Sequence, residues 1–249
     1  MGKRLLAIQH VDREGPDRLA DLAQARGMSI ETIRPDRGDA LPDPRQTSNT
    51  IALVLGGPMS VNDRHLADLA WLERELQWLA TWHQRKKPVL GVCLGAQLLA
   101  VACGGSIEPL QTGNPPHPLK EVGVGAIHWT IDPSQEPMLS GLRRCQLVLH
   151  WHGDRIRLPA SARLLGSSLH CPEQVFRVGC HAIGLQCHLE VSRQSLERWI
   201  QEDHHYVINA LGNDGPNMLR QHWNTFESEL TDQATHLLNN IFNELDQAA

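Results

Sequence analysis

Long apolar runs are missing from the sequence, and their absence excludes a helix that crosses a membrane. The opening segment MGKRLLAIQH carries two cations, but the apolar stretch of a signal peptide does not follow. Position 6 is leucine, where a myristoylation motif has serine or threonine. No later segment approaches the roughly 20 apolar residues that a membrane span needs. We therefore expect a cytoplasmic protein, whose six cysteines stay reduced rather than forming a disulfide framework.

An excess of positive charge is also missing. The net charge is -5, and no run of Lys and Arg exceeds three residues, whereas phosphate binding needs clustered cations. We therefore expect no nucleic-acid partner. With 41% hydrophobic and 20% charged residues, the chain has the composition of a folded globular protein rather than a disordered one.

The first hundred residues alternate between two kinds of segment. Short apolar clusters at 5–8, 51–55 and 88–92 are typical of buried strands in a partly parallel sheet. Between them, 16–26 and 66–82 have helical periodicity, the second with leucines three and four residues apart. This alternation predicts an α/β fold with a mixed, largely parallel central sheet flanked by helices.

The remainder of the chain has a different texture. Residues 104–186 are rich in Gly and Pro and contain short strand-like runs, which predict antiparallel hairpins joined to the same sheet. The expected strands are 125–131, 146–151, 162–167, 174–178 and 182–186. Beyond residue 192 the chain is predicted to be helical. No linker or repeat divides it, so we expect an α/β domain at 1–200 and a helical C-terminal extension at 201–249 that packs on the same domain.

An apolar stripe runs along the expected C-terminal helix. It is interpreted as core packing, while its period of about 3.5 residues would also suit a partner groove or the seam of a homo-oligomer. Its members are Leu219, Trp223, Phe226, Leu230, Leu237 and Ile241.

Cys93 stands alone on a predicted corner, because a strand ends at Val92 and a helix begins at Leu94. Such an elbow strains its central residue, and Gly91 and Gly95 remove the Cβ atoms that would collide there. The sulfur also lies at a helix N-terminus, where the dipole favours the thiolate. Most free cysteines are simply buried apolar residues. The pattern Gly-x-Cys-x-Gly-x-Gln at this corner instead predicts a nucleophile.

A cysteine nucleophile needs a base, and the base needs a group that orients it. His188 and Glu190 lie two residues apart at the end of an expected strand and so point to the same side. A His-x-Glu pair is weak evidence by itself in a chain with 14 histidines. Together with Cys93 it predicts a Cys-His-Glu triad.

The paired glycines of the run LGGPMS, which follow the expected strand at 51–55, predict an oxyanion hole. A flexible backbone there lets the N–H of Gly57 join that of Leu94 in binding a developing negative charge. Taken alone, Gly-Gly-Pro is usually a turn. Its place at the carboxyl end of a strand, where α/β sheets bind ligands, favours the functional interpretation.

The motifs GVCLGAQ and LGGPMS and the pair His188/Glu190 together resemble the class I glutamine amidotransferases. The resemblance is strongest to stand-alone proteins similar to the glutaminase domain of GMP synthase, and covers about residues 5–200. It implies a flavodoxin-like fold, no cofactor, a nucleophile at Cys93 and substrate contact by Gln97. Many relatives have proline where this chain has Leu189. The ATP-pyrophosphatase domain of GMP synthase has no counterpart here, so a complete synthase is not expected.

Other candidate sites carry less information. The spacing of Cys180, His181, Cys187 and His188 fits no common zinc site, and adjacent residues on a strand face opposite sides, so no metal site is expected. The two histidines of HWHGD at 150–154 line a substrate pocket or belong to an ordinary strand and turn. Its aspartate has the position of a turn residue. Three cysteines are expected to be packing residues, namely Cys103, Cys145 and Cys171.

The predicted reaction is hydrolysis of the glutamine side-chain amide through a γ-glutamyl thioester, releasing ammonia and glutamate. A γ-glutamyl peptide hydrolase would use the same residues on a larger leaving group, and a non-catalytic binding or regulatory module would retain only the fold. Ammonia from a glutaminase is used by a synthase or acceptor. We therefore expect a γ-glutamyl substrate such as glutamine, and either a separate synthase or acceptor protein or release of the products to solvent.

Overall fold

The computed structural model describes residues 2–248 and contains a nine-stranded sheet with the order β2-β1-β3-β4-β13-β12-β11-β8-β9. The strands from β2 to β13 in that order are parallel, and β12, β11, β8 and β9 are antiparallel to their neighbours. This confirms the mixed, largely parallel sheet. The strands are β1 (Arg4–Ile8), β2 (Ser29–Ile33), β3 (Thr50–Val54), β4 (Val89–Val92), β8 (Glu121–Trp129), β9 (Cys145–His152), β11 (Ala162–Ser167), β12 (Val175–Val178) and β13 (Ala182–Leu185).

Smaller elements complete the chain. Two short pairs lie outside the main sheet, β5 (Ser106–Pro109) with β10 (Asp154–Arg157) and β6 (Gln111–Thr112) with β7 (His117–Pro118). The α-helices are α1 (Asp17–Ala25), α2 (Ala70–Gln84), α3 (Leu94–Ala102), α4 (Arg193–Glu202), α5 (His204–Leu211) and α6 (Gly215–Gln247). Single 3₁₀ turns are η1 (Pro35–Arg37), η2 (Val61–Asp63), η3 (Ala67–Leu69), η4 (Pro133–Gln135) and η5 (Pro137–Leu139).

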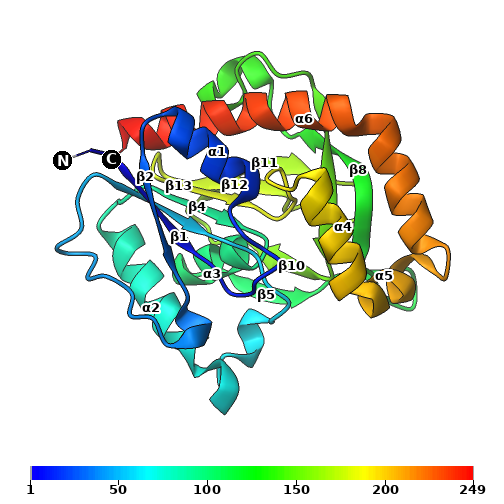
Figure 1. Cartoon of the computed structure of the whole chain (residues 1–249), viewed down its shortest axis with the longest axis horizontal. Coiled ribbons are helices and arrows are strands. Elements are labelled where there is room, and N and C mark those ends of the chain that lie inside the picture. Colours follow the sequence, from blue (N-terminus) through cyan, green and yellow to red (C-terminus); the bar gives the residue numbers. More distant parts are fainter. Residues whose placement is uncertain (1, 249) are drawn as a thin grey trace.

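Helices cover both faces of the parallel strands β1, β3, β4 and β13, which explains the apolar runs of these four strands. In β1, Leu5 and Ala7 pack in the core shared with α1 and α6, whereas Leu6 and Ile8 pack in the core shared with α2 and α3. A third cluster joins β9 to α4, α5 and the first half of α6. Figure 1 shows α6 running along one side of the molecule from α5 back towards the N-terminus.

Helix α2 differs from its sequence expectation. The helix begins at Ala70, after the 3₁₀ turn η3, so Leu66 lies outside it and is 47% exposed. Three tryptophans share the buried face with the leucines, because residues 71, 78 and 82 lie on one side of a helix. The prediction from the leucine spacing alone therefore began the helix too early and left the tryptophans out of its buried face.

Helix α6 has 33 residues and packs on β8, β9 and η5. All members of the predicted apolar stripe are buried except Phe226, which is 38% exposed. Near its end, Asp246 pairs with Lys3 Nζ at 3.0 Å, so the first strand and the last helix meet there (Figure 1). The division into a domain at 1–200 and an extension at 201–249 stays a prediction.

The described residues contain no helix that combines the length and the apolar character needed to cross a membrane. Their cysteines are all free thiols. Of the three cysteines expected to pack in the interior, Cys171 is buried and Cys103 is half-buried, but Cys145 is exposed. That expectation was wrong for Cys145 because it is the first residue of β9, at the edge of the sheet.

Candidate active site

Cys93 occupies the turn between β4 and α3 with φ 51° and ψ -109°, a backbone conformation that residues other than glycine rarely adopt. The turn is crowded: a Cβ at Gly91 would lie 2.5 Å from the carbonyl oxygen of Gly95, and a Cβ at Gly95 would overlap the carbonyl oxygen of Val54. Both glycines are therefore required by the close approach of strand and helix, as the sequence pattern predicts.

The side chain of Cys93 borders a cavity of about 320 Å³. Gln186 Nε2 donates a hydrogen bond to Sγ at 3.6 Å, and Sγ lies 3.9 Å from the carbonyl oxygen of Trp151. Gln97 lines the same cavity and donates from Nε2 to Gln186 Oε1 at 3.1 Å. The predicted substrate contact and the thiol are thus connected through Gln186, which the sequence analysis did not single out.

His188 and Glu190 form a buried pair after β13. His188 Nδ1 lies 2.7 Å from Glu190 Oε1, and Glu190 Oε2 accepts a hydrogen bond from the N–H of Leu189 at 3.0 Å. The ring of Trp199 packs edge-on against the imidazole, with 4.8 Å between ring centroids. Since Nδ1 faces a carboxylate, it carries the proton, and Nε2 is left without a hydrogen-bond partner in the described part of the chain.

Opposing effects act on the imidazole. Burial lowers the pKa of His188, but the charge and hydrogen bond of Glu190, together with the interaction with Cys93, outweigh burial and raise this pKa well above its usual value. Glu190 occupies Nδ1, which leaves Nε2 as the ring nitrogen that is available to Cys93. Cys93 therefore lies close enough to His188 to affect its pKa, and the Cys-His-Glu triad stays a prediction.

Gly57, predicted as an oxyanion donor, lies in the wall of the same cavity as Cys93. A Cβ added to it would lie 3.0 Å from the side chain of Leu94, so the two residues are neighbours. The preceding residue, Gly56, is held by His10, whose Nδ1 lies 3.0 Å from the Gly56 carbonyl oxygen and whose Nε2 lies 3.0 Å from Glu75. This buried His10–Glu75 pair fixes the glycine loop and carries no recognisable sequence motif.

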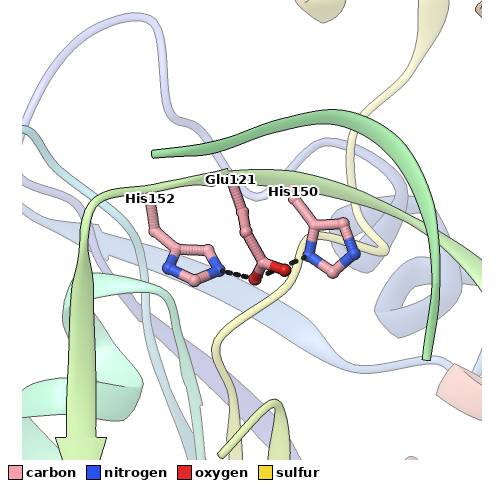
Figure 2. A group of neighbouring side chains, drawn as sticks. All are labelled: Glu121, His150 and His152. Atoms are coloured by element: carbon pink, nitrogen blue, oxygen red, sulfur yellow. Dashed lines mark ion pairs between the residues drawn. The ribbon is translucent and has the colours of Figure 1, made fainter. Parts of the chain in front are cut away.

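A second buried cluster lies at the end of β9 and joins Glu121, His150 and His152 (Figure 2). Glu121 Oε2 lies 3.1 Å from His152 Nε2 and 3.9 Å from His150 Nδ1, and it accepts a hydrogen bond from Gln174 at 2.7 Å. His152 lines the cavity, so the interpretation of HWHGD as a pocket wall holds for this histidine. His150 is not among the residues that line the cavity.

Glu121, His150 and His152 are the group of residues within 2–248 whose potential ligand atoms are close enough to share a metal ion, all within 4.8 Å of one another. The amide nitrogen of Gln174 contacts both Glu121 and His152, so it occupies the space between two of these ligands. These contacts form a hydrogen-bond network that fixes the end of β9. Within the described residues, no group of this kind is formed by Cys180, His181, Cys187 and His188.

Charged side chains also line the cavity. Arg13 pairs with Asp203 at 3.3 Å and lies 3.5 Å from Glu14, and all three side chains line the cavity. Asp154, predicted as a turn residue, begins β10 and accepts a hydrogen bond from Ser60 at 3.2 Å within the same cavity. Sequence reasoning missed Arg13, Glu14 and Asp203, because they come from a loop and a helix junction without a motif.

The strand-to-helix elbow with an adjacent His-Glu pair agrees with the comparison to known families. The sequence model described as glutamine amidotransferase class-I matches residues 17–206, which is most of the chain. The chain therefore belongs to the class I glutamine amidotransferase family. This confirms the resemblance stated from the motifs.

Relatives of this class I amidotransferase are of two kinds. It is 29% identical over 210 residues to the glutamine amidotransferase-like protein YfeJ of Salmonella typhimurium, covering 84% of each chain. It is 34% identical over 147 residues to the glutamine-hydrolysing GMP synthase of Streptococcus mutans, covering 57% of this chain but 25% of the synthase. Among solved structures, a glutamine amidotransferase from Thermotoga maritima superposes with a TM-score of 0.83 and 25% identity, covering 99% of both chains. A glutamine amidotransferase from Methylobacillus flagellatus gives a TM-score of 0.81, also with 25% identity, and covers 98% of this chain and 96% of that one.

Proposed function

We propose that this protein hydrolyses the side-chain amide of glutamine through a γ-glutamyl thioester on Cys93. The observation that carries the proposal is a strained Cys93 at the cavity together with a buried His188–Glu190 pair, whose imidazole interacts with Cys93 and whose Nε2 has no hydrogen-bond partner in the described residues. Similarity to the glutamine-hydrolysing GMP synthase of Streptococcus mutans supports glutamine as the substrate.

The first half-reaction forms the thioester. The Cys93 thiolate attacks the side-chain carbonyl carbon, and the oxygen becomes an oxyanion that the N–H groups of Gly57 and Leu94 stabilise. His188 then gives its Nε2 proton to the departing nitrogen, and the carbon–nitrogen bond breaks to release ammonia. Glu190 keeps the imidazole oriented and balances its charge. Gln97 contacts the bound γ-glutamyl group.

The second half-reaction restores the enzyme. Neutral His188 takes a proton from water, and the resulting hydroxide attacks the thioester carbonyl. The carbon–sulfur bond breaks, glutamate leaves, and the Cys93 thiolate is again paired with protonated His188. No redox step or cofactor enters this sequence. Ammonia passes to a separate synthase or acceptor protein, or is released to solvent.

A γ-glutamyl peptide hydrolase is the second candidate, because the cavity extends past Cys93 to Arg13, Asp203 and Tyr206. That extension offers room and charge for a leaving group larger than ammonia. Comparing kcat/KM for glutamine with that for γ-glutamyl dipeptides distinguishes the two. A strong preference for dipeptides would replace glutaminase by peptidase as the proposed function.

The direct test is to measure release of ammonia and glutamate by the wild type and by Cys93→Ala. A glutamine-like chloromethyl ketone should then add one label, on Cys93. Because Cys145 and Cys180 are exposed, the labelling is done in a Cys145→Ser/Cys180→Ser background. Burial raises the pKa of the Cys103 and Cys171 thiols to about 12, so these should stay unlabelled. Full turnover by Cys93→Ala would exclude the proposal.

A further inference from the structure

Glu14 is a buried carboxyl group in the active-site cavity with unused hydrogen-bonding capacity. Glu14 is 7% exposed, and its side chain lines the cavity that Cys93 also lines. Arg13 Nε lies 3.5 Å from Glu14 Oε1, too far for a good hydrogen bond. Within residues 2–248 no side chain or backbone N–H is found to donate a hydrogen bond to this carboxyl group. The carboxyl group therefore borders the cavity with acceptor capacity that a bound substrate can use.

The position of Glu14 relative to the nucleophile is defined by Gly56. A Cβ on Gly56 would overlap Glu14 Oε2 and would lie 3.5 Å from Cys93 Cβ. Both the carboxyl oxygen and Cys93 therefore border the space that a side chain on Gly56 would fill. The absence of a side chain at position 56 keeps this space open.

The loop that carries Glu14 also contacts the region of His188. Trp199 connects the two regions, because its ring packs against His188 and its Nε1 donates to the carbonyl oxygen of Arg13 at 2.8 Å. The loop that carries Glu14 is thus anchored to the residue that packs on the imidazole.

In the proposed reaction, the departing nitrogen must face His188 to receive its proton. A primary amide nitrogen has two N–H bonds, and a carboxylate is the strongest neutral-pH acceptor for them. We propose that Glu14 accepts a hydrogen bond from the N–H of the scissile amide and so makes the site selective for γ-glutamyl amides over γ-glutamyl esters. An ester oxygen in the same place has no hydrogen to donate, and its lone pairs face the carboxylate. This inference rests on the proposed glutaminase function.

The charge state of the carboxyl group adds a pH dependence. Burial raises the pKa of Glu14, while the positive charges of His188 and Arg13 oppose that shift. Glu190 raises it further, and His10 lowers it. Because the acceptor is the ionised form, amide hydrolysis should rise with pH through this pKa, and ester hydrolysis should lack this contribution.

The test measures kcat/KM for glutamine and for glutamic acid γ-methyl ester in the wild type, Glu14→Gln and Glu14→Ala. Losing one charge-assisted hydrogen bond should lower the glutamine value about 10- to 100-fold in Glu14→Ala. The ester value should stay within about threefold or rise. Glu14→Gln keeps a neutral acceptor of the same size, so its kcat/KM for glutamine should lie between the values of the wild type and of Glu14→Ala. Thermal unfolding of each variant checks that it is folded.

Asp154→Asn is the matched control, since Asp154 is another carboxylate in the same cavity that already accepts a hydrogen bond from Ser60. Its amide-to-ester ratio should equal that of the wild type, whatever the change in either rate. Equal loss of both activities in Glu14→Ala would overturn the inference, because a structural role or contact with the substrate α-amine affects amide and ester alike. Hydrolysis of neither substrate by the wild type would instead refute the proposed function, and the inference with it.

Discussion

Replacing Cys93 by glycine and by alanine isolates the free energy stored in the elbow. Both variants lose the thiol, so they differ in whether a Cβ must adopt φ 51° and ψ -109°. Such a conformation costs a residue other than glycine about 1–3 kcal/mol. The larger entropy of glycine in the unfolded chain opposes this by about 0.4–1 kcal/mol. We therefore expect Cys93→Gly to be more stable than Cys93→Ala by about 1–2 kcal/mol.

For a chain of 249 residues this difference corresponds to a Tm higher by about 2–8 °C in the glycine variant. Thermal unfolding followed by circular dichroism measures it under identical conditions. Cys103 provides the matched control, because it ends the helix that Cys93 begins and has an ordinary φ of -92°. There alanine should be at least as stable as glycine. If glycine were also more stable than alanine at position 103, the strain attributed to the backbone of Cys93 would be refuted.

Further predictions concern the triad, the glycine packing and the buried histidine. Glu190→Gln should lower kcat by roughly 10²- to 10⁴-fold with little change in KM, because the carboxylate orients His188 rather than binding substrate; wild-type turnover in a steady-state assay would make Glu190 a bystander. Gly95→Ala should cost at least about 1–3 kcal/mol in urea unfolding, since its methyl group overlaps a carbonyl oxygen, whereas in Gly15→Ala the nearest atom is 3.7 Å away and the change should be small. Burial lowers the pKa of His150 to about 4, so the unfolded chain binds a proton that the folded chain does not between about pH 6.5 and 4. Stability should therefore fall by about 2 kcal/mol for this group between pH 6.5 and 5, and a His150→Gln variant with the same acid sensitivity as the wild type would contradict this.

The nucleophile elbow and the fold could be predicted because their determinants are local in sequence. An apolar strand, a cysteine between two glycines and an apolar helix follow one another within 88–102, and each imposes its own geometry. Family membership followed from the same motifs and is confirmed. His188 and Glu190 lie in contact, while the triad with Cys93, the oxyanion hole and the contact by Gln97 stay predictions.

The rest of the cavity could not be predicted, because its contacts join distant segments. Glu14 meets the glycine loop some forty residues later, and the Glu121 network closes with Gln174 across 53 positions. A loop carboxylate has no periodicity that reveals which wall it will face. Cys145 shows an error of another kind. It was expected to pack in the interior but is exposed, since an apolar residue at a strand end can remain outside the core.

The long α6 helix has a consequence for how the chain is made. Its last turns place Ile241, Phe242 and Leu245 in the same core cluster as Leu5 and Ala7 of the first strand. During synthesis, the side of β1 that faces α6 therefore stays uncovered until α6 has been made. At about 5–20 residues per second this interval is roughly 10–50 s. Until then, apolar surface of the central sheet is open to chaperones, and the core on this face closes only after most of the chain has been translated.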